Sequence, residues 1–442
     1  MALVKNQDQP LDPPVLDADR PATVAWHPLR LLKVIASTWL LGYYLAANTL
    51  FDRVSPGGLI MKASGDYQSW LVFSATAMLC VVATFSLVPV SGLRMVHKYP
   101  PIWLLLAVFC SSLLVSLPIS SIDIEQGRAI SSILGALSVG VIAVRVVLRY
   151  KPQDIVASIT FSAVIQGTYA IVYQRQHINQ IISGTIFRAG GTFADPNQLY
   201  FLMLIALPFA VVGMIQAKNN SVRFFFILAC SIEFAAIVLT CSRGGLISLA
   251  VAITLFSYLA SHSKKFSILV SVCLFLLFGT VQVVRMAGRE NATSLSRSDA
   301  SRVRLWQEGW EKFVSHPLTG NGIGSFQSPV ITQNSNYLSF NNIDEPKNNF
   351  LYWLDALGIG GAFLLTFFAL AIYMIIKKSL PHSLSVATAA AWAGFFMAGL
   401  FDTPFGPPQR YVGACCFGLL LGITASLPEF RGELFHLNEA KT

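Results

Sequence analysis

Residues 302–326 read RVRLWQEGWEKFVSHPLTGNGIGSF and lie inside the longest polar interval of the chain, residues 285–348. Apolar runs flank this interval on both sides. Its first part carries five arginines: Arg285, Arg289, Arg297, Arg302 and Arg304. Because this interval holds the densest set of candidate reactive groups, we interpret the rest of the chain as a scaffold that presents it.

The composition is that of an integral membrane protein. The chain has 442 residues, of which 54% are hydrophobic and 12% charged, and its mean hydropathy is +0.60. Soluble domains contain roughly 25% charged residues. The net charge of +9 fits the retention of Lys and Arg on cytoplasmic loops and predicts no nucleic-acid partner.

Apolar runs alternate with short polar breaks, and each run is long enough to cross a bilayer of roughly 30 Å as a helix. The pattern predicts an all-α membrane protein with about twelve spans. We place them at residues 31–51, 69–90, 101–119, 129–148, 155–173, 197–216, 222–240, 244–260, 266–284, 349–376, 383–401 and 411–427.

These spans divide the chain into five parts. Residues 1–28 are predicted to be a disordered cytoplasmic tail, and residues 29–284 a transmembrane bundle of nine spans. Residues 285–348 form a large outer loop with an amphipathic helix, residues 349–427 add three spans, and residues 428–442 form a second cytoplasmic tail.

The basic residues near span ends predict the orientation, because they are retained on the cytoplasmic side. With both termini cytoplasmic, the inner loops carry Arg94, Lys98, Arg149, Lys151, Lys218, Arg223, Lys264, Lys265, Lys377 and Lys378. The 285–348 loop is then on the outer side. All seven cysteines fall within or beside apolar segments, which predicts neither a disulfide nor a structural metal.

The quoted stretch predicts an amphipathic helix. Apolar residues recur at helical spacing: Leu305, Trp306, Gly309, Trp310, Phe313 and Val314. Such a helix either lies in the membrane interface, with Arg302 and Arg304 turned toward lipid phosphates, or caps the bundle. His316 begins the Gly-rich turn that follows, and the sequence leaves open whether it is structural or catalytic.

Three further groups outside this stretch are candidates. Arg243 falls between two apolar helices beside Gly244, where its planar guanidinium suits a phosphate group; the alternative is that it reaches toward lipid head groups. Arg188 precedes a span for which Asp195 is the predicted N-cap. Glu233 falls in mid-span, where an acid is a functional candidate or a protonated group hydrogen-bonded to a neighbour such as Gln166.

Four segments together resemble the O-antigen ligase and polymerase superfamily of polysaccharide-assembly membrane proteins. They are RAGGTFADPNQLY at 188–200, CSRGG at 241–245, the quoted stretch, and KNNFLYWLDALGIGG at 347–361. The resemblance extends over residues 100–427 and implies a fold related to the membrane-embedded class C glycosyltransferases in a bacterial inner membrane.

The resemblance also implies the substrate and the residues that hold it. The donor would be a glycan on undecaprenyl pyrophosphate, used without a cofactor or metal. Arg243 and one or both of Arg302 and Arg304 would bind the pyrophosphate, with Arg188 and His316 as further binding candidates. Partners would be the lipid-linked oligosaccharide and membrane lipids, with a chain-length regulator and a flippase as further candidates.

One position departs from the family pattern. The ligases have a His-Asn pair before the first glycine of the following helix, and that His is thought to activate the acceptor hydroxyl. Counting back from Gly358 gives Lys347, followed by Asn348. Lys347 is then either a base or another phosphate-binding cation; in the second case the base is Glu345, Asp344 or none.

This departure favours a polymerase that joins lipid-linked repeat units by inverting, metal-independent transfer. The nearer alternative is a ligase that moves the glycan to a lipid core or protein acceptor. The more distant alternative is a transporter, for which paired broken helices and charges near the midplane would be expected.

Overall fold

The computed structural model describes residues 152–176, 188–191, 196–261, 292–334, 337–343, 345–380, 382–404 and 411–427, with parts of 130–147 and 265–273. The predicted tails and the predicted spans at 31–51, 69–90 and 101–119 lie outside these residues. The domain boundaries therefore stay predictions, as does the count of twelve spans.

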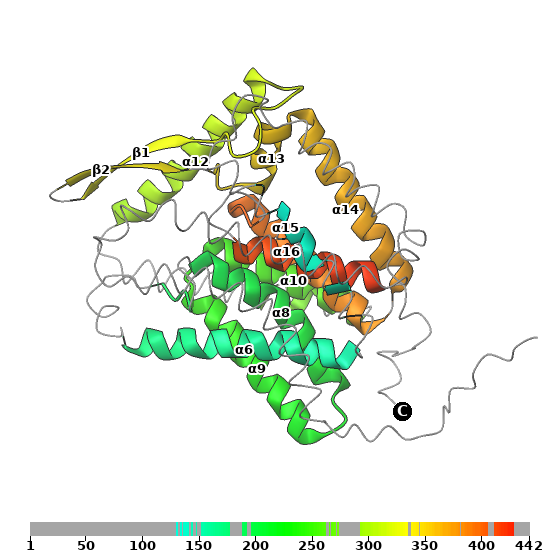
Figure 1. The fold of residues 1–442 in the computed structure, drawn as a ribbon. Helices are drawn as coiled ribbons and strands as arrows, with labels where there is room; N and C mark the ends of the chain where they lie inside the picture. Colours follow the sequence, from blue (N-terminus) through cyan, green and yellow to red (C-terminus); the bar gives the residue numbers. More distant parts are fainter. Residues whose placement is uncertain are drawn as a thin grey trace, which may run out of the picture.

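Helices make up most of the described chain. The elements before the long loop are α6 (Pro152–Gln176), α8 (Pro196–Gln216), α9 (Asn220–Leu239) and α10 (Arg243–Ser261). The elements from the loop onward are α12 (Ala292–Ser315), β1 (Ser328–Asn334), β2 (Tyr337–Ile343), α13 (Asn349–Leu357), α14 (Ile359–Ser379), α15 (Ser383–Phe401) and α16 (Tyr411–Ser426). Figure 1 shows α12, the strands and α13 gathered beside one end of the bundle.

Six of the described helices are long and apolar enough to cross a membrane. They lie in α6, α8, α9, α10, α14 and α15, and α16 contains a shorter apolar helix, Cys416–Ser426. The predicted spans at 155–173, 197–216, 222–240, 244–260, 383–401 and 411–427 are confirmed as helices, with bounds that differ by at most three residues. The protein is therefore a multi-pass membrane protein.

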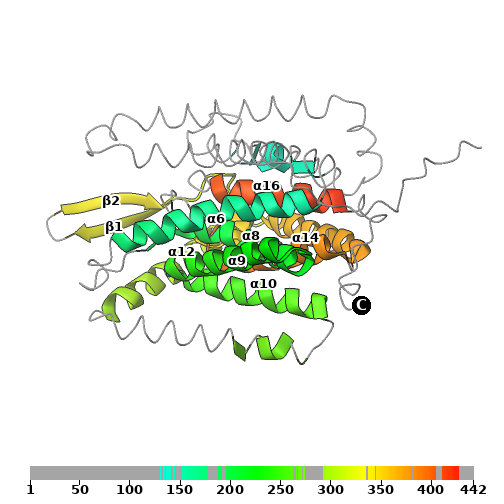
Figure 2. The same ribbon diagram turned by 90° about the horizontal axis from the view of Figure 1, so that it is seen from below.

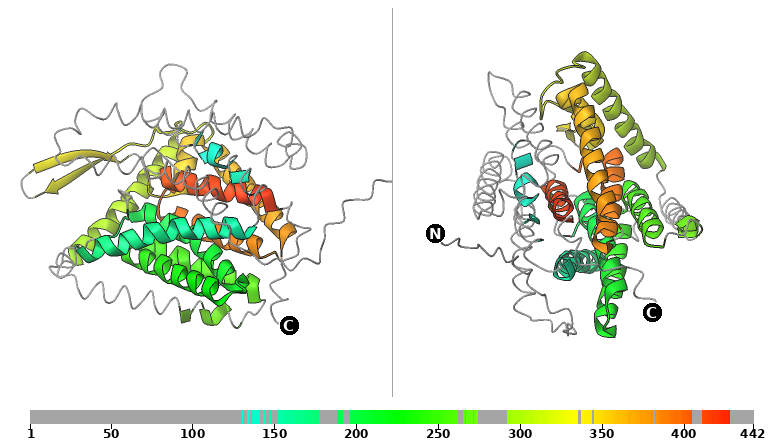
Figure 3. Two further views of the ribbon diagram at one scale, coloured as in Figure 1. Left: turned by 60° about the horizontal axis from the view of Figure 1, so that its bottom comes forward. Right: turned by 90° about the vertical axis from the view of Figure 1, so that its right-hand side faces the viewer.

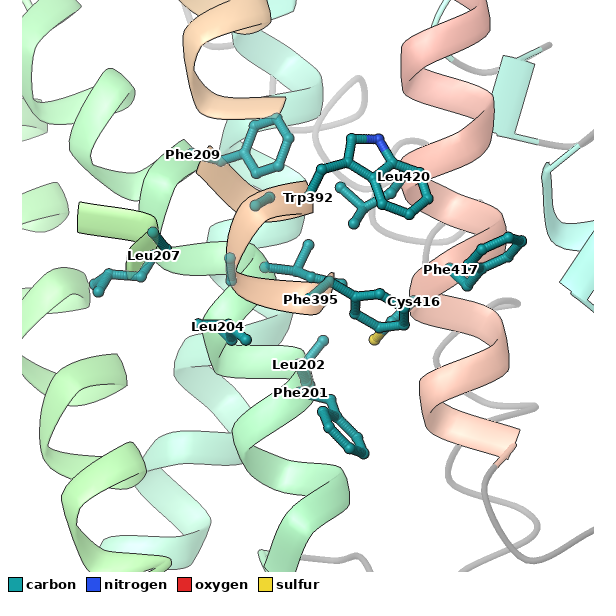
Figure 4. Close-up of a cluster of buried hydrophobic side chains, with 14 of the residues drawn as sticks. Phe201, Leu202, Leu204, Leu207, Phe209, Trp392, Phe395, Cys416, Phe417 and Leu420 are labelled. Carbon is teal, nitrogen blue, oxygen red and sulfur yellow. The ribbon is translucent and has the colours of Figure 1, made fainter. Parts of the chain in front are cut away.

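Helix α8 is at the centre of the bundle. It contacts α6, α9, α10, α15 and α16, and most of its residues are buried. The close-up in Figure 4 shows aromatic side chains from α8, α15 and α16 converging, among them Phe201, Trp392 and Phe417. The Trp392 and Phe417 rings meet edge to face, with centroids 5.5 Å apart, an arrangement that aromatic pairs prefer.

The predicted span 349–376 is wrong as a single helix. The structure divides it into α13 and α14 at Gly358, whose φ of 60° and ψ of −146° lie outside the helical region. The backbone N–H of Ile359 turns aside and donates to Pro317 O at 2.7 Å. Helix α13, with nine residues, is too short to be a candidate span, and it packs against the loop helix α12 as well as α14 and α15.

The expectation of an all-helical chain needs a second correction. Strands β1 and β2 form an antiparallel hairpin, with Ser328 paired to Ile343 and Asn334 to Tyr337. The run Val330-Ile331-Thr332 is β-branched, which favours extended backbone over helix. Figure 2 shows the hairpin projecting beyond the end of the bundle that carries α12. We call this end the loop side.

Candidate functional site

The last turn of α15 is a meeting point for the loop-side elements. Arg302 of α12 donates from Nη1 to Phe401 O at 2.8 Å. The first turn of α10 packs on the same residue, since a Cβ on Gly244 would lie 2.7 Å from Phe401 Cβ. Helices α10, α12 and α15 therefore converge at Phe401, and Arg243 is the first residue of α10.

The start of α13 joins the same turn. Asn348 accepts hydrogen bonds at Oδ1 from Phe350 N and Leu351 N, at 2.9 and 3.1 Å, and so caps the helix. Its Nδ2 donates to Leu400 O at 3.2 Å. A Cβ on Gly399 would lie 3.2 Å from Asn349 Cβ. Predicted residues Asn348 and Arg302 thus bind adjacent carbonyls of α15.

Lys347 precedes this cap in a left-handed conformation, with φ of 54°. Its ammonium donates to Glu345 Oε1 in an ion pair in which the Glu345 carboxylate is the more buried partner. The backbone carbonyl of Lys347 accepts from Trp306 Nε1 at 3.4 Å. Because its Nζ is held against the Glu345 carboxylate, this geometry favours a charge-pairing role for Lys347 over a basic one.

Arg188 anchors the segment before α8 to the turn before α10. It donates from Nε to Thr240 O at 2.8 Å and from Nη2 to Asn197 Oδ1 at 2.7 Å. The backbone N–H of Ala189 adds a bond to Leu239 O at 3.0 Å. Arg188 thereby binds the carbonyl of Thr240, three residues before Arg243 in sequence, and two of its donors already hold protein oxygens. The predicted N-cap Asp195 lies outside the described residues.

The two arginines of α12 have different surroundings. Arg302 is partly buried and bound to α15. Arg304 is 60% exposed and pairs with Glu308 on its own helix, with 2.7 Å between Nε and Oε1. Of the two, Arg302 is the one that the structure brings to the meeting point.

His316 belongs to a turn that docks on the α13–α14 junction. Asn321 N donates to Asp355 O at 2.7 Å and Gly322 N to Ala356 O at 3.1 Å. The exposed His316 ring contacts Ser315 Oγ at 3.0 Å from Nδ1. Hydrogen bonds join His316 to the end of α12, at Phe313 and Ser315, and to Gly320.

Sequence reasoning missed two buried acids on the loop side. Asp355 accepts from Asn321 Nδ2 at 2.8 Å. Burial raises the pKa of its carboxyl, against the lowering effects of the Asn321 hydrogen bond and the nearby charges of Lys312 and His316. Asp402 ends α15 and accepts from Thr403 N at 3.0 Å. Each is a single acidic residue next to an apolar run, and this isolation is the sequence feature that could have pointed to it.

Glu233 lies inside the bundle rather than at the meeting point. It is fully buried on α9, about 10 Å below the end of the helix at a rise of 1.5 Å per residue. Neither carboxylate oxygen has a hydrogen-bond partner among the described residues, so the alternative of a bond to a neighbour such as Gln166 is not observed there. The described residues also contain no group of three metal-ligating side chains.

The fold and the site define a multi-pass membrane protein in which the helices that carry Arg243 and Arg302 meet at the end of α15. Residues 224–366 match the family described as O-antigen ligase. The resemblance to the O-antigen ligase and polymerase superfamily is thereby confirmed over α10, α12, the hairpin, α13 and parts of α9 and α14. No curated protein matches the chain.

Proposed function

We propose that the protein is a polysaccharide polymerase. In this proposal it joins oligosaccharide repeat units carried on undecaprenyl pyrophosphate, at the periplasmic face of a bacterial inner membrane. The family match supports glycan assembly. The observation that carries the site is the bond from Arg302 to Phe401, the residue on which the first turn of α10 packs beside Arg243.

The two arginines would act on the leaving group. A hydroxyl of the incoming unit attacks the anomeric carbon of the growing chain, the new C–O bond forms and the bond to pyrophosphate breaks. Arg243 and Arg302 offset the charge that develops on the departing pyrophosphate, an effect of about 3–4 kcal/mol per donor in comparable sites. The amide groups at the start of α10 add a partial positive charge.

The proton of the attacking hydroxyl needs an acceptor. Glu345 is the carboxylate that pairs with Lys347, and we assign it this role, with Lys347 as the side chain that positions it. A direct displacement of this kind inverts the anomeric carbon. Nuclear magnetic resonance of the product should show the configuration opposite to that of the donor; retention would contradict the mechanism.

The first experiment is to delete the gene and size the polysaccharide in the lipid-linked and released fractions. Loss of long chains with single units left on the lipid supports a polymerase. Long chains that accumulate on the lipid without reaching an acceptor would identify a ligase with the same donor. Normal chains in both fractions would contradict both assignments, and failure of single units to reach the outer face would indicate a transporter.

The two arginines of α12 provide a matched pair of variants. We expect Arg302→Ala to slow chain elongation by about 10²- to 10³-fold, the usual effect of losing one preorganised donor. Arg304→Ala should retain most activity, because Arg304 is exposed and paired within its helix. The measurement is elongation of a lipid-linked donor by the purified protein in nanodiscs.

Arg302→Lys separates charge from structure, because it keeps the cation and loses the planar fork. Partial activity in Arg302→Lys with normal thermal stability would support the phosphate role. Equal loss of activity in the Arg302→Ala and Arg304→Ala variants would count against the assigned site.

A further inference from the structure

Helix α12 carries apolar side chains on two sides, whereas the sequence suggested one apolar face. On one side Leu305 is buried, and a Cβ on Gly309 would lie 3.1 Å from Pro346 Cβ. On the other side Val303, Trp310 and Val314 are 49%, 53% and 55% exposed. These three are spaced by seven and four residues, which places them on one face of the helix.

The exposed face continues past the end of α12. Leu318, four residues after Val314, is 77% exposed. The chain keeps a helix-like turn there, because Gly320 N donates to His316 O at 2.9 Å. We call Val303, Trp310, Val314 and Leu318 the outer stripe.

The outer stripe meets the lipid-facing surface of α14. Ile359 begins α14 and donates from its backbone N–H to Pro317 O at 2.7 Å, directly beside Leu318. From Ile359 the exposed apolar face of this spanning helix continues through Phe363 and Phe367. An exposed apolar face on a membrane-spanning helix contacts lipid, so Leu318 and Ile359 lie together at the membrane boundary.

We infer that the outer stripe seats in the interfacial layer of the bilayer and holds α12 along the membrane surface. Figure 3 shows that α12 and α14 run in different directions from the region of α13, so α12 does not follow α14 through the bundle. Trp310 is the residue type that favours this layer. The exposed Ser315 and His316 stand beside Leu318 and supply polar groups for the head-group region. This inference requires no part of the proposed function.

Fluorescence quenching in nanodiscs tests the placement. Nanodiscs are made with lipids brominated near the head-group end of the acyl chain, or with ordinary lipids and iodide in the water. The Trp310→Phe variant isolates the contribution of Trp310 by difference. We expect that contribution to be quenched strongly by bromolipid and weakly by iodide. Trp306→Phe is the control, since Trp306 is partly buried and its ring donates to Lys347 O.

Two outcomes would overturn the inference. Quenching by iodide alone would place Trp310 in water, and protection from both quenchers would mean that protein covers the outer stripe. Leu318→Trp gives an independent reading from the other end of the stripe and should add emission that bromolipid quenches. A Leu318→Trp signal that bromolipid leaves unchanged would contradict the placement even if Trp310→Phe fails to accumulate.

Discussion

Lys347 combines a strained backbone with a charge pair, and both features bear on its role. A left-handed conformation costs an ordinary residue about 1–2 kcal/mol, and here it directs the ammonium to Glu345. Such local strain is commonly held at functional sites. We therefore expect position 347 to require a cationic side chain.

Substitutions at Lys347 distinguish a cation from a base. Lys347→Arg should keep chain elongation within about tenfold, because arginine stays charged and still reaches a carboxylate. Lys347→Gln should lose most of it. Lys347→His tests the family's own residue: full activity in Lys347→His with none in Lys347→Arg would establish the base role and refute ours. The assay is the nanodisc elongation reaction.

Asp355 predicts a pH dependence of stability. Burial raises its pKa, so the folded protein binds this proton more tightly than the unfolded chain. The free energy of unfolding therefore falls as pH rises from the unfolded pKa, 3.8, through the folded one. Asp355→Asn keeps an acceptor for Asn321 without the charge. It should melt at or above the wild-type temperature at pH 7, and the difference should shrink toward pH 4.

The control for Asp355→Asn is Asp355→Ala, which removes the acceptor altogether. The Asn321 amide keeps its bond to Lys312 O, so we expect a loss of about 1 kcal/mol, the net worth of a typical hydrogen bond. Thermal unfolding in detergent measures both variants. An Asp355→Asn variant that is as unstable at pH 7 as Asp355→Ala would show that the negative charge itself stabilises the fold.

At the level of elements, the start of α14 just after the α13–α14 junction includes a glycine, Gly361, at which there is no space for a side chain. A Cβ on Gly361 would lie 2.1 Å from Trp353 O, whereas a Cβ on Gly360 would meet nothing within 4 Å. Gly361→Ala should therefore destabilise the protein by about 1–3 kcal/mol or more through overpacking. Gly360→Ala should be neutral or slightly stabilising because alanine favours helix. Melting temperatures of the two variants in detergent check this, and equal effects would contradict it.

The sequence predicts helices well where apolar runs are long, and less well where backbone contacts intervene. Helix α15 has the bounds that hydropathy predicts, and α8, α9 and α10 differ by one or two residues at either end. The break at Gly358 was missed because α13 is as apolar as a span. At this break Ile359 donates a hydrogen bond to Pro317, 42 residues earlier, which no local pattern contains. The hairpin was missed because two short mixed strands give a weak signal.

For the molecule as a whole, the candidate residues could be identified from the sequence, but the place where they meet could not. Arg243 and Arg302 were singled out because charged side chains are few in this chain, and Asn348 because it matches the Asn of the family's His-Asn pair. The surface that unites them is the end of α15, where Leu400 and Phe401 contribute carbonyl oxygens. Every residue has a backbone carbonyl, so the sequence does not indicate which of them will accept these hydrogen bonds.

The predicted orientation of the whole chain can be tested with exposed positions on opposite sides. His316 lies on the loop side and Lys378 at the far end of α14, and both are exposed. In spheroplasts, a membrane-impermeant maleimide should label His316→Cys at once and Lys378→Cys only after permeabilisation. The wild-type protein, with its own cysteines, sets the background. The reverse pattern would invert the topology and move the site to the cytoplasm.

The turn at 317–322 has a consequence for how such proteins diverge. It is joined to 355–359 by three main-chain hydrogen bonds, from Asn321, Gly322 and Ile359. A joint made by the main chain accepts many side chains, as long as the glycines that allow the close approach remain. Homologues could therefore drift until pairwise sequence identity fades while the joint keeps its shape. Structural superposition should then detect common ancestry that sequence alignment no longer detects.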